Sequence, residues 1–290
     1  MDSKNNTGYL NEDFKIFYLK DYDKVNTDYH HHNFNKIVIF ISGDAQYIVE
    51  GKTYNLKPWD ILLINKNEIH KCITNNKVPY ERLVIWMKDD IEECDKYFKS
   101  LTKCFNISKE MSTNIFRLKE NSCNAIKNLV PKILKYNNSN DVYNITLRNS
   151  FFIQMLVILN KSYLKKTNID TTDDVFYDKT TEQLINYINK NLNNSLEIDA
   201  LADKFELSKH YLMRKFKKQT GHSIHSYIIQ KRLMLAIELM KNNSCMYIVA
   251  EEAGFNEYST FVRAFKKYYE LSPKKYYESY NKIDNIDIID

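Results

Sequence analysis

The sequence predicts an α+β protein of more than one domain. A β-barrel or sandwich with helices after it comes first, and an all-α domain with two helix-turn-helix units follows. Three observations predict this: 290 residues in all, strand-like runs confined to the first 90 or so, and a helical repeat in the last hundred. This length exceeds that of a typical single domain. With 43% apolar residues, the chain can bury cores, which argues against global disorder.

Residues 14–88 carry the strand signals. A β-branched run at 37–41 ends at a turn, and runs at 46–50 and 53–56 flank Gly51, which is typical of a β-hairpin. Many short strands without intervening helices predict a barrel or sandwich, assigned to residues 1–90. Further strand-like runs lie at residues 61–64 and 81–87.

Residues 91–166 are predicted to be helical. Two interpretations of one apolar stripe remain open: it forms the interface of a homodimer, or it packs on the chain's own barrel. A polar stretch at 167–178 is the expected linker. The stripe consists of Leu147, Phe151, Met155 and Ile158.

Residues 179–290 contain a repeat. Two units, at about 195–219 and 245–269, share an Arg, a Phe and a Lys-Lys pair at a fixed offset, which indicates a repeated helix-turn-helix. Gly254 fits the turn of the second unit, and Glu206 holds that position in the first. The residues predicted to cap helices are Ser195, Ser208 and Asn256.

The second helix of each unit is predicted to present a basic face. Residues 208–232 include seven Lys or Arg and no Asp or Glu, in a chain whose formal charge is only +5. Leu212 and Phe216 lie four apart and face the core, which leaves Arg214 on another face. One long helix at 223–241 would hold the two units at a fixed separation.

Composition narrows the function classes. The five glycines are too scattered for a P-loop or a dinucleotide-binding turn. Five dispersed cysteines without a C-x-x-C favour reduced thiols over a disulfide or zinc framework. The N-terminus lacks an apolar signal segment, and the apolar stretch at 151–159 is too short to span a bilayer. We therefore expect a soluble cytoplasmic protein with no cofactor and no membrane partner.

The helical half resembles the DNA-binding domain of AraC/XylS-family bacterial transcription regulators. The resemblance spans about residues 180–280. One departure is Tyr269-Glu270, where the family often has Thr-Gly. The motifs are Leu201-Ala202, Ser208-x-x-Tyr211-Leu212-x-Arg214-x-Phe216-Lys-Lys, Thr220-Gly221, Arg232-x-x-x-Ala236-x-x-Leu239, Ile248-Val-Ala250-x-x-x-Gly254-Phe255, Phe261-x-Arg263-x-Phe265-Lys-Lys and Leu271-Ser272-Pro273-x-x-Tyr276.

The resemblance implies that the chain binds double-stranded DNA through the second helix of each unit. Arginine can pair with guanine bidentately, whereas lysines suit phosphates. The residues expected at bases are His210, Met213, Arg214, Tyr258, Ser259, Val262 and Arg263. Those expected at phosphates are Ser208, Lys209, Lys217, Lys218, Asn256, Lys266 and Lys267.

The strand-rich half resembles a cupin barrel. His30-x-His32-x-x-x-Lys36 resembles the first cupin motif, with a Lys where the metal-binding Glu belongs. Residues 58–60 and 68–70 resemble the second motif, with Trp59 replacing its Gly. A cation beside the histidines would weaken metal binding, so no metal is expected. The family relation implies an effector pocket instead, with candidate lining residues His30, His32, Phe34, His70 and Trp86.

The expected function is a sequence-specific DNA-binding regulator, an activator that works with RNA polymerase, controlled by a small molecule in the barrel. Two alternatives stay open. One is a metal-dependent cupin enzyme with a DNA-binding appendage, against which Lys36 argues. The other is a regulator controlled by a protein partner without a small ligand.

Overall fold

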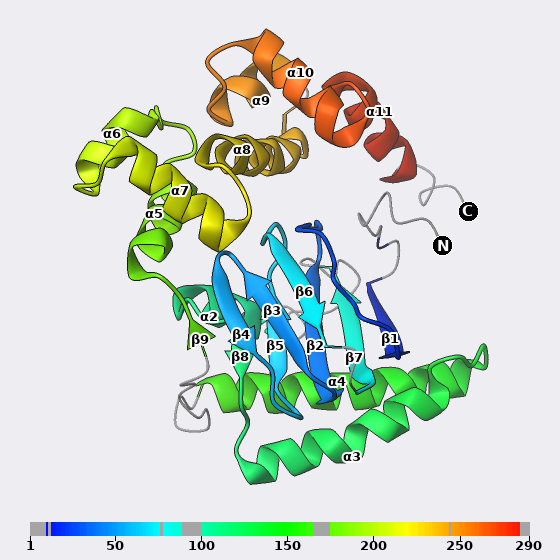
Figure 1. The fold of residues 1–290 in the computed structure, drawn as a ribbon. Coiled ribbons are helices and arrows are strands. Elements are labelled where there is room, and N and C mark those ends of the chain that lie inside the picture. Colours follow the sequence, from blue (N-terminus) through cyan, green and yellow to red (C-terminus); the bar gives the residue numbers. More distant parts are fainter. Residues whose placement is uncertain are drawn as a thin grey trace. The chain divides into compact units, whose positions relative to one another are not determined.

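The computed structural model describes residue 10 and residues 13–75, 78–88, 100–164, 175–243 and 245–284. The chain divides into two compact units, Met1–Phe176 and Tyr177–Asp290, coloured blue to green and green to red in Figure 1. Each unit has its own core.

The expected linker at 167–178 lies for the most part outside the described residues. Its last residues are described. A short strand at Val175–Phe176 pairs with the first unit, and Asp178 caps the first helix of the second.

The first unit is built on two antiparallel sheets, ordered β1-β7-β2-β5-β8 and β6-β3-β4-β9. The predicted hairpin around Gly51 is confirmed, because Gln46 pairs with Asn55 and Val49 with Lys52. The strands are β1 (Phe14–Asp21), β2 (Asn35–Ser42), β3 (Ala45–Val49), β4 (Lys52–Asn55), β5 (Ile61–Ile64), β6 (His70–Thr74), β7 (Tyr80–Met87), β8 (Ile115–Phe116) and β9 (Val175–Phe176).

The side chains between the two sheets form the barrel core. Alternate residues of β2 point inward, so Val38 and Phe40 are buried here while Ile37 and Ile39 face the other side. Tyr54 of β4 closes the core from the second sheet, and its hydroxyl donates to Asn114 Oδ1 at 3.1 Å.

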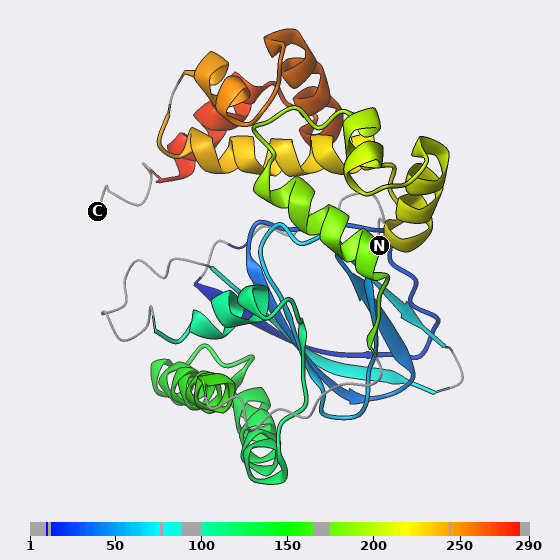
Figure 2. The same cartoon turned by 90° about the vertical axis from the view of Figure 1, so that its left-hand side faces the viewer.

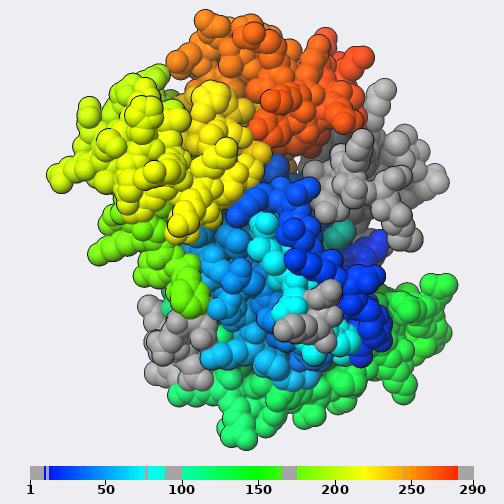
Figure 3. All heavy atoms as spheres, in the orientation of Figure 1, coloured from blue at the N-terminus to red at the C-terminus, as the bar shows by residue number. Residues whose placement is uncertain are grey.

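The outer face of the first sheet is covered by α3 (Glu120–Tyr136) and α4 (Val142–Leu164), with α2 (Lys103–Glu110) beside them. Figures 1 and 2 show α3 and α4 lying side by side along this face, and in Figure 3 they form the green margin of the unit.

The apolar stripe of α4 packs largely on the chain's own core. Met155 is fully buried there, and Phe151 and Ile158 pack against it partly buried. Leu147 stays 41% exposed. The structure therefore favours the second of the two interpretations for three of the four residues.

By length and composition, Val142–Ser162 of α4 is long and apolar enough to cross a membrane. The expectation drawn from residues 151–159 considered only the uninterrupted apolar run, whereas the helix that contains this run extends well beyond it. The helix nevertheless carries Asn160, which is buried and donates to the Leu101 and Leu156 carbonyls. Such a helix meets the length criterion while serving as a core element of its unit.

In its described residues, the second unit contains helices and no strand. Leu233 and Ala236 of the central helix α8 are buried in its core with Phe261 and Phe265. The helices are α5 (Lys179–Lys190), α6 (Ile198–Lys204), α7 (Lys209–Thr220), α8 (Ile224–Met240), α9 (Met246–Glu252), α10 (Tyr258–Tyr269) and α11 (Pro273–Asp284).

Candidate functional site

The first helix-turn-helix lies in the second compact unit and consists of the helices α6 and α7. These two helices are called the first unit pair below. Leu201, Ala202, Leu212 and Phe216 are buried and hold the two helices together. The turn between them passes through Glu206, which takes a left-handed φ of 54°. The helix α6 starts after Glu197, so the prediction of Ser195 as its cap was wrong: residues 195–197 are still outside the helix.

Ser208 begins α7 as predicted. Its backbone is extended, at φ −66° and ψ 143°, and its hydroxyl accepts a hydrogen bond from the Tyr211 backbone N–H at 3.4 Å. This satisfies one of the free N–H groups of the first turn. Gly221 ends the helix in the left-handed region, with φ 74°.

The solvent face of α7 is positive. His210, Met213 and Arg214 are exposed, as the expected base contacts require, and so are Lys217 and Lys218. Two other lysines are paired within the chain. Lys209 lies 2.9 Å from Asp199 and Lys215 lies 3.0 Å from Asp178. The first pair is strongly exposed and contributes little to stability, so Lys209 remains available to another anion.

The second helix-turn-helix consists of α9 and α10, called the second unit pair. Phe255, Phe261 and Phe265 are buried in its core. Gly254 makes the turn with φ 89°, as predicted. A Cβ at this position would lie 2.0 Å from the Leu192 carbonyl oxygen, so no larger residue fits without a backbone shift.

The start of α10 differs from the prediction. Glu257, not Asn256, is the N-cap residue, and no side chain makes a capping hydrogen bond there. The cap falls one residue later because Glu257 is still extended, with φ −131° and ψ 129°. The capping role expected of Asn256 was therefore wrong, although Asn256 is exposed beside the helix start.

The solvent face of α10 matches that of α7 in part. Tyr258 is 39% exposed, and Ser259 and Arg263 are also exposed. Val262 packs partly buried against the core, so it is the least accessible of the expected base contacts. Lys266 and Lys267 extend the positive face toward the C-terminal end of the helix, both exposed.

The helix α8 connects the two unit pairs. Ser223 caps it by accepting from the Ser226 N–H at 3.1 Å. Arg232 donates from Nε to the Leu192 carbonyl at 2.8 Å and from Nη2 to that of Asn194, also at 2.8 Å. These bonds fix the loop that Gly254 touches, so α8 couples the turn of the second pair to the chain preceding α6.

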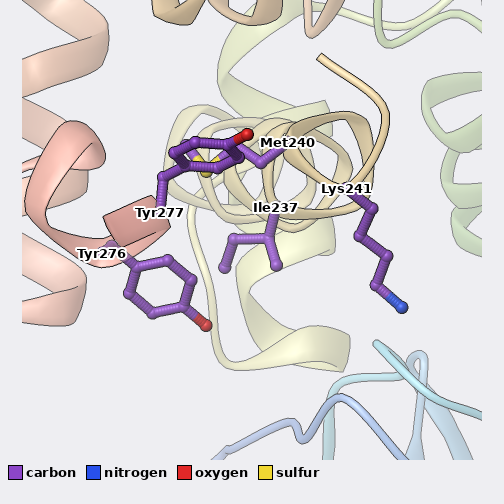
Figure 4. Close-up of a pocket in the computed structure, with 5 residues that line it drawn as sticks. All are labelled: Ile237, Met240, Lys241, Tyr276 and Tyr277. Carbon is purple, nitrogen blue, oxygen red and sulfur yellow. The ribbon is translucent and has the colours of Figure 1, made fainter. Parts of the chain in front are cut away.

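A small hollow lies between α8 and α11 (Figure 4). Tyr276 and Tyr277 face Ile237 and Met240 across it, and Lys241 lies at its edge. Its volume of about 10 Å³ holds one water at most, so it is a packing defect and not a ligand site.

In the first unit the structure brings the five expected pocket residues together. The His30 and His70 rings are 4.3 Å apart between centroids, and those of His32 and His70 are 4.8 Å apart. Phe34 stacks on His32 at 4.2 Å and meets Trp86 at 4.7 Å. A backbone bridge between His30 and His70 positions the first two rings.

Each of the three histidines is oriented by a backbone carbonyl. Nδ1 of His30, His32 and His70 lies 2.9 Å from the carbonyl of Asp28, Phe34 and Glu68 respectively. A carbonyl oxygen only accepts, so we assign the proton to each Nδ1, which leaves Nε2 an acceptor in the neutral ring. Nε2 of His32 and of His70 is buried without a partner among the described residues.

Lys36 lies among these rings. It is paired directly with Trp86 across β2 and β7, so the two side chains share the inner face. Burial lowers the pKa of Lys36 to about 8. Burial, and then the Lys36 charge, holds the pKa of both His32 and His70 well below the usual value. The histidines are therefore neutral at pH 7.

The cluster is not arranged as a metal centre. In the described part of the chain, no group of three or more His, Cys, Asp or Glu side chains is placed to hold a metal ion. Lys36 stands where the third ligand of a cupin would be. Trp59, at the position of the second motif's Gly, takes a left-handed φ of 70° and so keeps the glycine-like turn.

Sequence reasoning missed the second polar group of the barrel. Tyr80 donates to the Tyr47 hydroxyl at 3.1 Å, and the Cys72 thiol lies 3.7 Å from Tyr80. Arg82 stacks on the Tyr80 ring at 4.0 Å. Inward alternation along β6 and β7 is the signal that could have found them.

Comparison with known proteins agrees with this construction. Residues 201–279 match the family model described as a helix-turn-helix domain, and residues 16–91 match the AraC-like ligand binding domain. The two matched stretches together make up more than half of the chain. Over both domains the chain resembles the regulators of the AraC family. It is a transcription regulator with a helix-turn-helix DNA-binding domain and a ligand-binding domain.

Curated relatives cover most of the chain. The HTH-type transcriptional activator RhaS of Mannheimia succiniciproducens is 24% identical over 247 residues, which is 85% of this chain and 87% of the relative. RhaS of Escherichia coli is 23% identical over 254 residues, 84% of this chain and 85% of the relative.

Among solved structures, ToxT from Vibrio cholerae covers 92% of this chain and 98% of its own, with 18% identity and a TM-score of 0.36. The C-terminal domain of the response regulator yesN from Fusobacterium nucleatum is 32% identical. It covers 34% of this chain and 99% of its own, with a TM-score of 0.32.

Proposed function

We propose that the chain activates transcription by holding its two recognition helices, α7 and α10, on DNA when a small molecule occupies the N-terminal barrel. The observation that carries this is the repeated exposed positive face. Neither α7 nor α10 contains an Asp or Glu, and both expose an Arg followed by a Lys-Lys pair.

The two faces divide into base and phosphate contacts. Arg214 and Arg263 lie at equivalent positions and suit guanine, which offers two acceptors in the major groove. The lysines toward the end of each helix suit phosphates and set the salt dependence. His210, Met213, Tyr258, Ser259 and the half-buried Val262 complete the proposed base-reading set, and Ser208, Lys209 and Asn256 the phosphate set.

The proposed division of labour follows the predicted organisation: residues 1–90 sense the effector, 91–166 support the barrel and a homodimer contact, and 179–290 bind DNA. RNA polymerase is the partner of an activator. The ligand acts only through its different affinity for states that do and do not place the DNA domain correctly. Relatives named as activators support the sign of regulation.

We infer further that the chain is not an enzyme and works in the cytoplasm. Lys36 among the histidines disfavours the metal chemistry of cupin enzymes. DNA is the proposed partner of both unit pairs. Because bacterial DNA lies in the cytoplasm, we place the chain there.

Transcription in vitro tests this function. Promoters next to the chain's own gene are transcribed by RNA polymerase of the same bacterium with and without the full-length chain. We expect more transcript with the chain, and loss of the increase with Arg214→Ala or Arg263→Ala. Unchanged transcript from every promoter that the chain binds would contradict activation, and a decrease would make it a repressor.

A further inference from the structure

The barrel interior holds polar groups that the described chain does not satisfy. Lys36 Nζ makes no hydrogen bond or ion pair with any described residue, although it lies deep enough for burial to lower its pKa. Trp86 Nε1 is a buried donor without a partner, and His32 and His70 each offer a buried Nε2 acceptor. These four groups lie together, since Lys36 pairs with Trp86 and its charge acts on both histidines.

The charge of Lys36 is uncompensated. The groups that act on its pKa are the Cys72 thiol and Arg82, and no carboxylate of the described residues is among them. An ammonium taken out of water is unfavourable unless an anion pairs with it. Lys36 also keeps part of its accessible surface, so other side chains do not enclose it completely. The missing anion can therefore come from outside the chain.

We propose that these four groups, on His32, His70, Lys36 and Trp86, form a cluster that binds the anion of a small hydroxy acid, such as a sugar acid. The carboxylate accepts from Lys36 Nζ and Trp86 Nε1, and two hydroxyl groups donate to His32 Nε2 and His70 Nε2. Trp86, which stays partly exposed and packs against the buried Phe34, supplies an apolar wall for the carbon skeleton. The inference rests on the proposed sensing function of the barrel and adds the chemical class of its ligand.

Other ligand classes leave part of the cluster unsatisfied. A neutral sugar pairs with the histidine acceptors but leaves the ammonium without a counter-charge. A simple fatty acid neutralises Lys36 but leaves both Nε2 atoms without a donor. A metal ion would sit beside a positive charge. Among these classes, only an anion that also carries hydroxyl groups satisfies all four groups.

Binding to the purified full-length chain tests the proposal. The probes are D-galacturonate, D-glucuronate and D-gluconate, with D-galactose and D-glucose as their neutral counterparts, hexanoate as the acid without hydroxyls, and glucose 6-phosphate as the phosphate. Calorimetry gives the dissociation constants. We expect one hydroxy acid to bind at least tenfold more tightly than its neutral counterpart and than hexanoate, as a charge-assisted hydrogen bond implies.

Two variants locate the site. Lys36→Met is expected to weaken hydroxy acid binding at least tenfold, whereas Lys71→Met is expected to leave it unchanged. Lys71 is a matched control on the same barrel: it alternates with the inward His70 and Cys72 of β6, and its Nζ lies 5.1 Å from the Tyr29 ring. Equal weakening by both variants would overturn the assignment to Lys36.

The stability of the ligand-free chain gives a second readout. Because burial lowers the Lys36 pKa from 10.5 to about 8, the unfolded chain binds more protons between these values, so stability rises with pH from about 8 to 10.5. His30, His32, His70, Cys72 and Arg82 are the titratable groups around it. Lys36→Met removes this rise and raises the melting temperature at pH 7 by about 2 °C or more. A lower melting temperature would mean that Lys36 is satisfied within the chain.

The outcomes separate this inference from the proposed function. If a neutral sugar binds most tightly and its affinity is unchanged by Lys36→Met, the proposal of a hydroxy acid ligand is wrong. The proposed function as a ligand-controlled regulator would still stand. If glucose 6-phosphate binds more tightly than every carboxylate probe, the proposed carboxylate group of the ligand is wrong. Failure of the chain to bind specific DNA contradicts the regulator itself, and that measurement uses none of these ligands.

Discussion

The two unit pairs reach the same backbone path with different residues. Both turns need a left-handed residue: Glu206 supplies it at φ 54° in the first pair and Gly254 at φ 89° in the second. Both recognition helices also end in a left-handed residue, Gly221 after α7 and Glu270 after α10. Glycine thus occupies the turn in the second pair, as Gly254, and the end of the recognition helix in the first pair, as Gly221.

Packing explains why the two pairs differ. Glu206 is exposed, so its side chain extends into solvent and the only cost is conformational. Gly254 is buried against the Leu192 carbonyl, which Arg232 holds in place. The backbone conformation is required in both pairs, but the glycine is required only where the chain packs closely against the turn.

The largest expected effect is at Gly254. Gly254→Ala places a Cβ 2.0 Å from the Leu192 oxygen at a left-handed φ, so we expect a loss of at least about 3 kcal/mol in the free energy of unfolding. Denaturant unfolding measures it. Gly221→Ala, at an exposed left-handed glycine, is the control and should cost about 1 kcal/mol. Equal losses would refute the packing argument.

The arginines test whether both pairs read DNA. Arg214→Ala and Arg263→Ala are each expected to cost about 1–3 kcal/mol of discrimination, at one half of the operator only. Fluorescence anisotropy with operators mutated in either half measures this. If one variant relaxes both halves, or neither, the two pairs do not act as separate readers.

The lysine pairs compare the phosphate contacts. Replacing Lys217 and Lys218 with Ala is expected to weaken binding to all sequences, about tenfold near physiological salt, and to reduce the slope of log affinity against log salt by about 2. Replacing Lys266 and Lys267 should do the same. A loss confined to one sequence would instead assign these lysines to bases.

Helix capping distinguishes the pairs more finely. Ser208→Ala removes the hydroxyl that accepts from the Tyr211 N–H, so a loss of about 1 kcal/mol in the free energy of unfolding is expected. Glu257→Ala, at the equivalent start of α10, removes no capping bond and should change stability by less than about 0.5 kcal/mol. Thermal unfolding of both variants measures the two losses in stability. Similar losses would contradict the proposed difference in capping.

The smallest effect is a gain. Glu206→Gly relieves the left-handed strain of the first turn, partly offset by greater freedom of the unfolded chain, so we expect stabilisation of about 0.5 kcal/mol. Lys204→Gly, two residues earlier in α6, should destabilise by about 1 kcal/mol. Destabilisation by Glu206→Gly would show that the Glu206 side chain supports the turn.

Local signals predicted much of the fold. The hairpin at Gly51, the cap at Ser208 and the turn at Gly254 each follow from a residue type at a fixed position. The two-residue strands β8 and β9 exist only through pairing with β5 and β4, so no local pattern marks them. Asn256 was misplaced as a cap because the start of α10 depends on the backbone angles of Glu257.

The candidate sites were predictable to different degrees. Spacing placed His30, His32 and His70 together, since cupin-like motifs bring them to one end of the barrel. That Lys36 lacks a partner could not be read from the sequence, because it depends on which side chains face it from β6 and β7. Likewise, the partial burial of Val262 follows from its packing in the second core.

Selection of genomic DNA fragments by the full-length chain, followed by sequencing, tests the central claim most directly. We expect a motif of two blocks centred about 10 bp apart, because two recognition helices on one face of DNA enter successive major grooves. The Arg214→Ala variant should lose base preference in one block, and the Arg263→Ala variant in the other. Salt-sensitive recovery of fragments with no motif, or a single block lost equally in both variants, would contradict it.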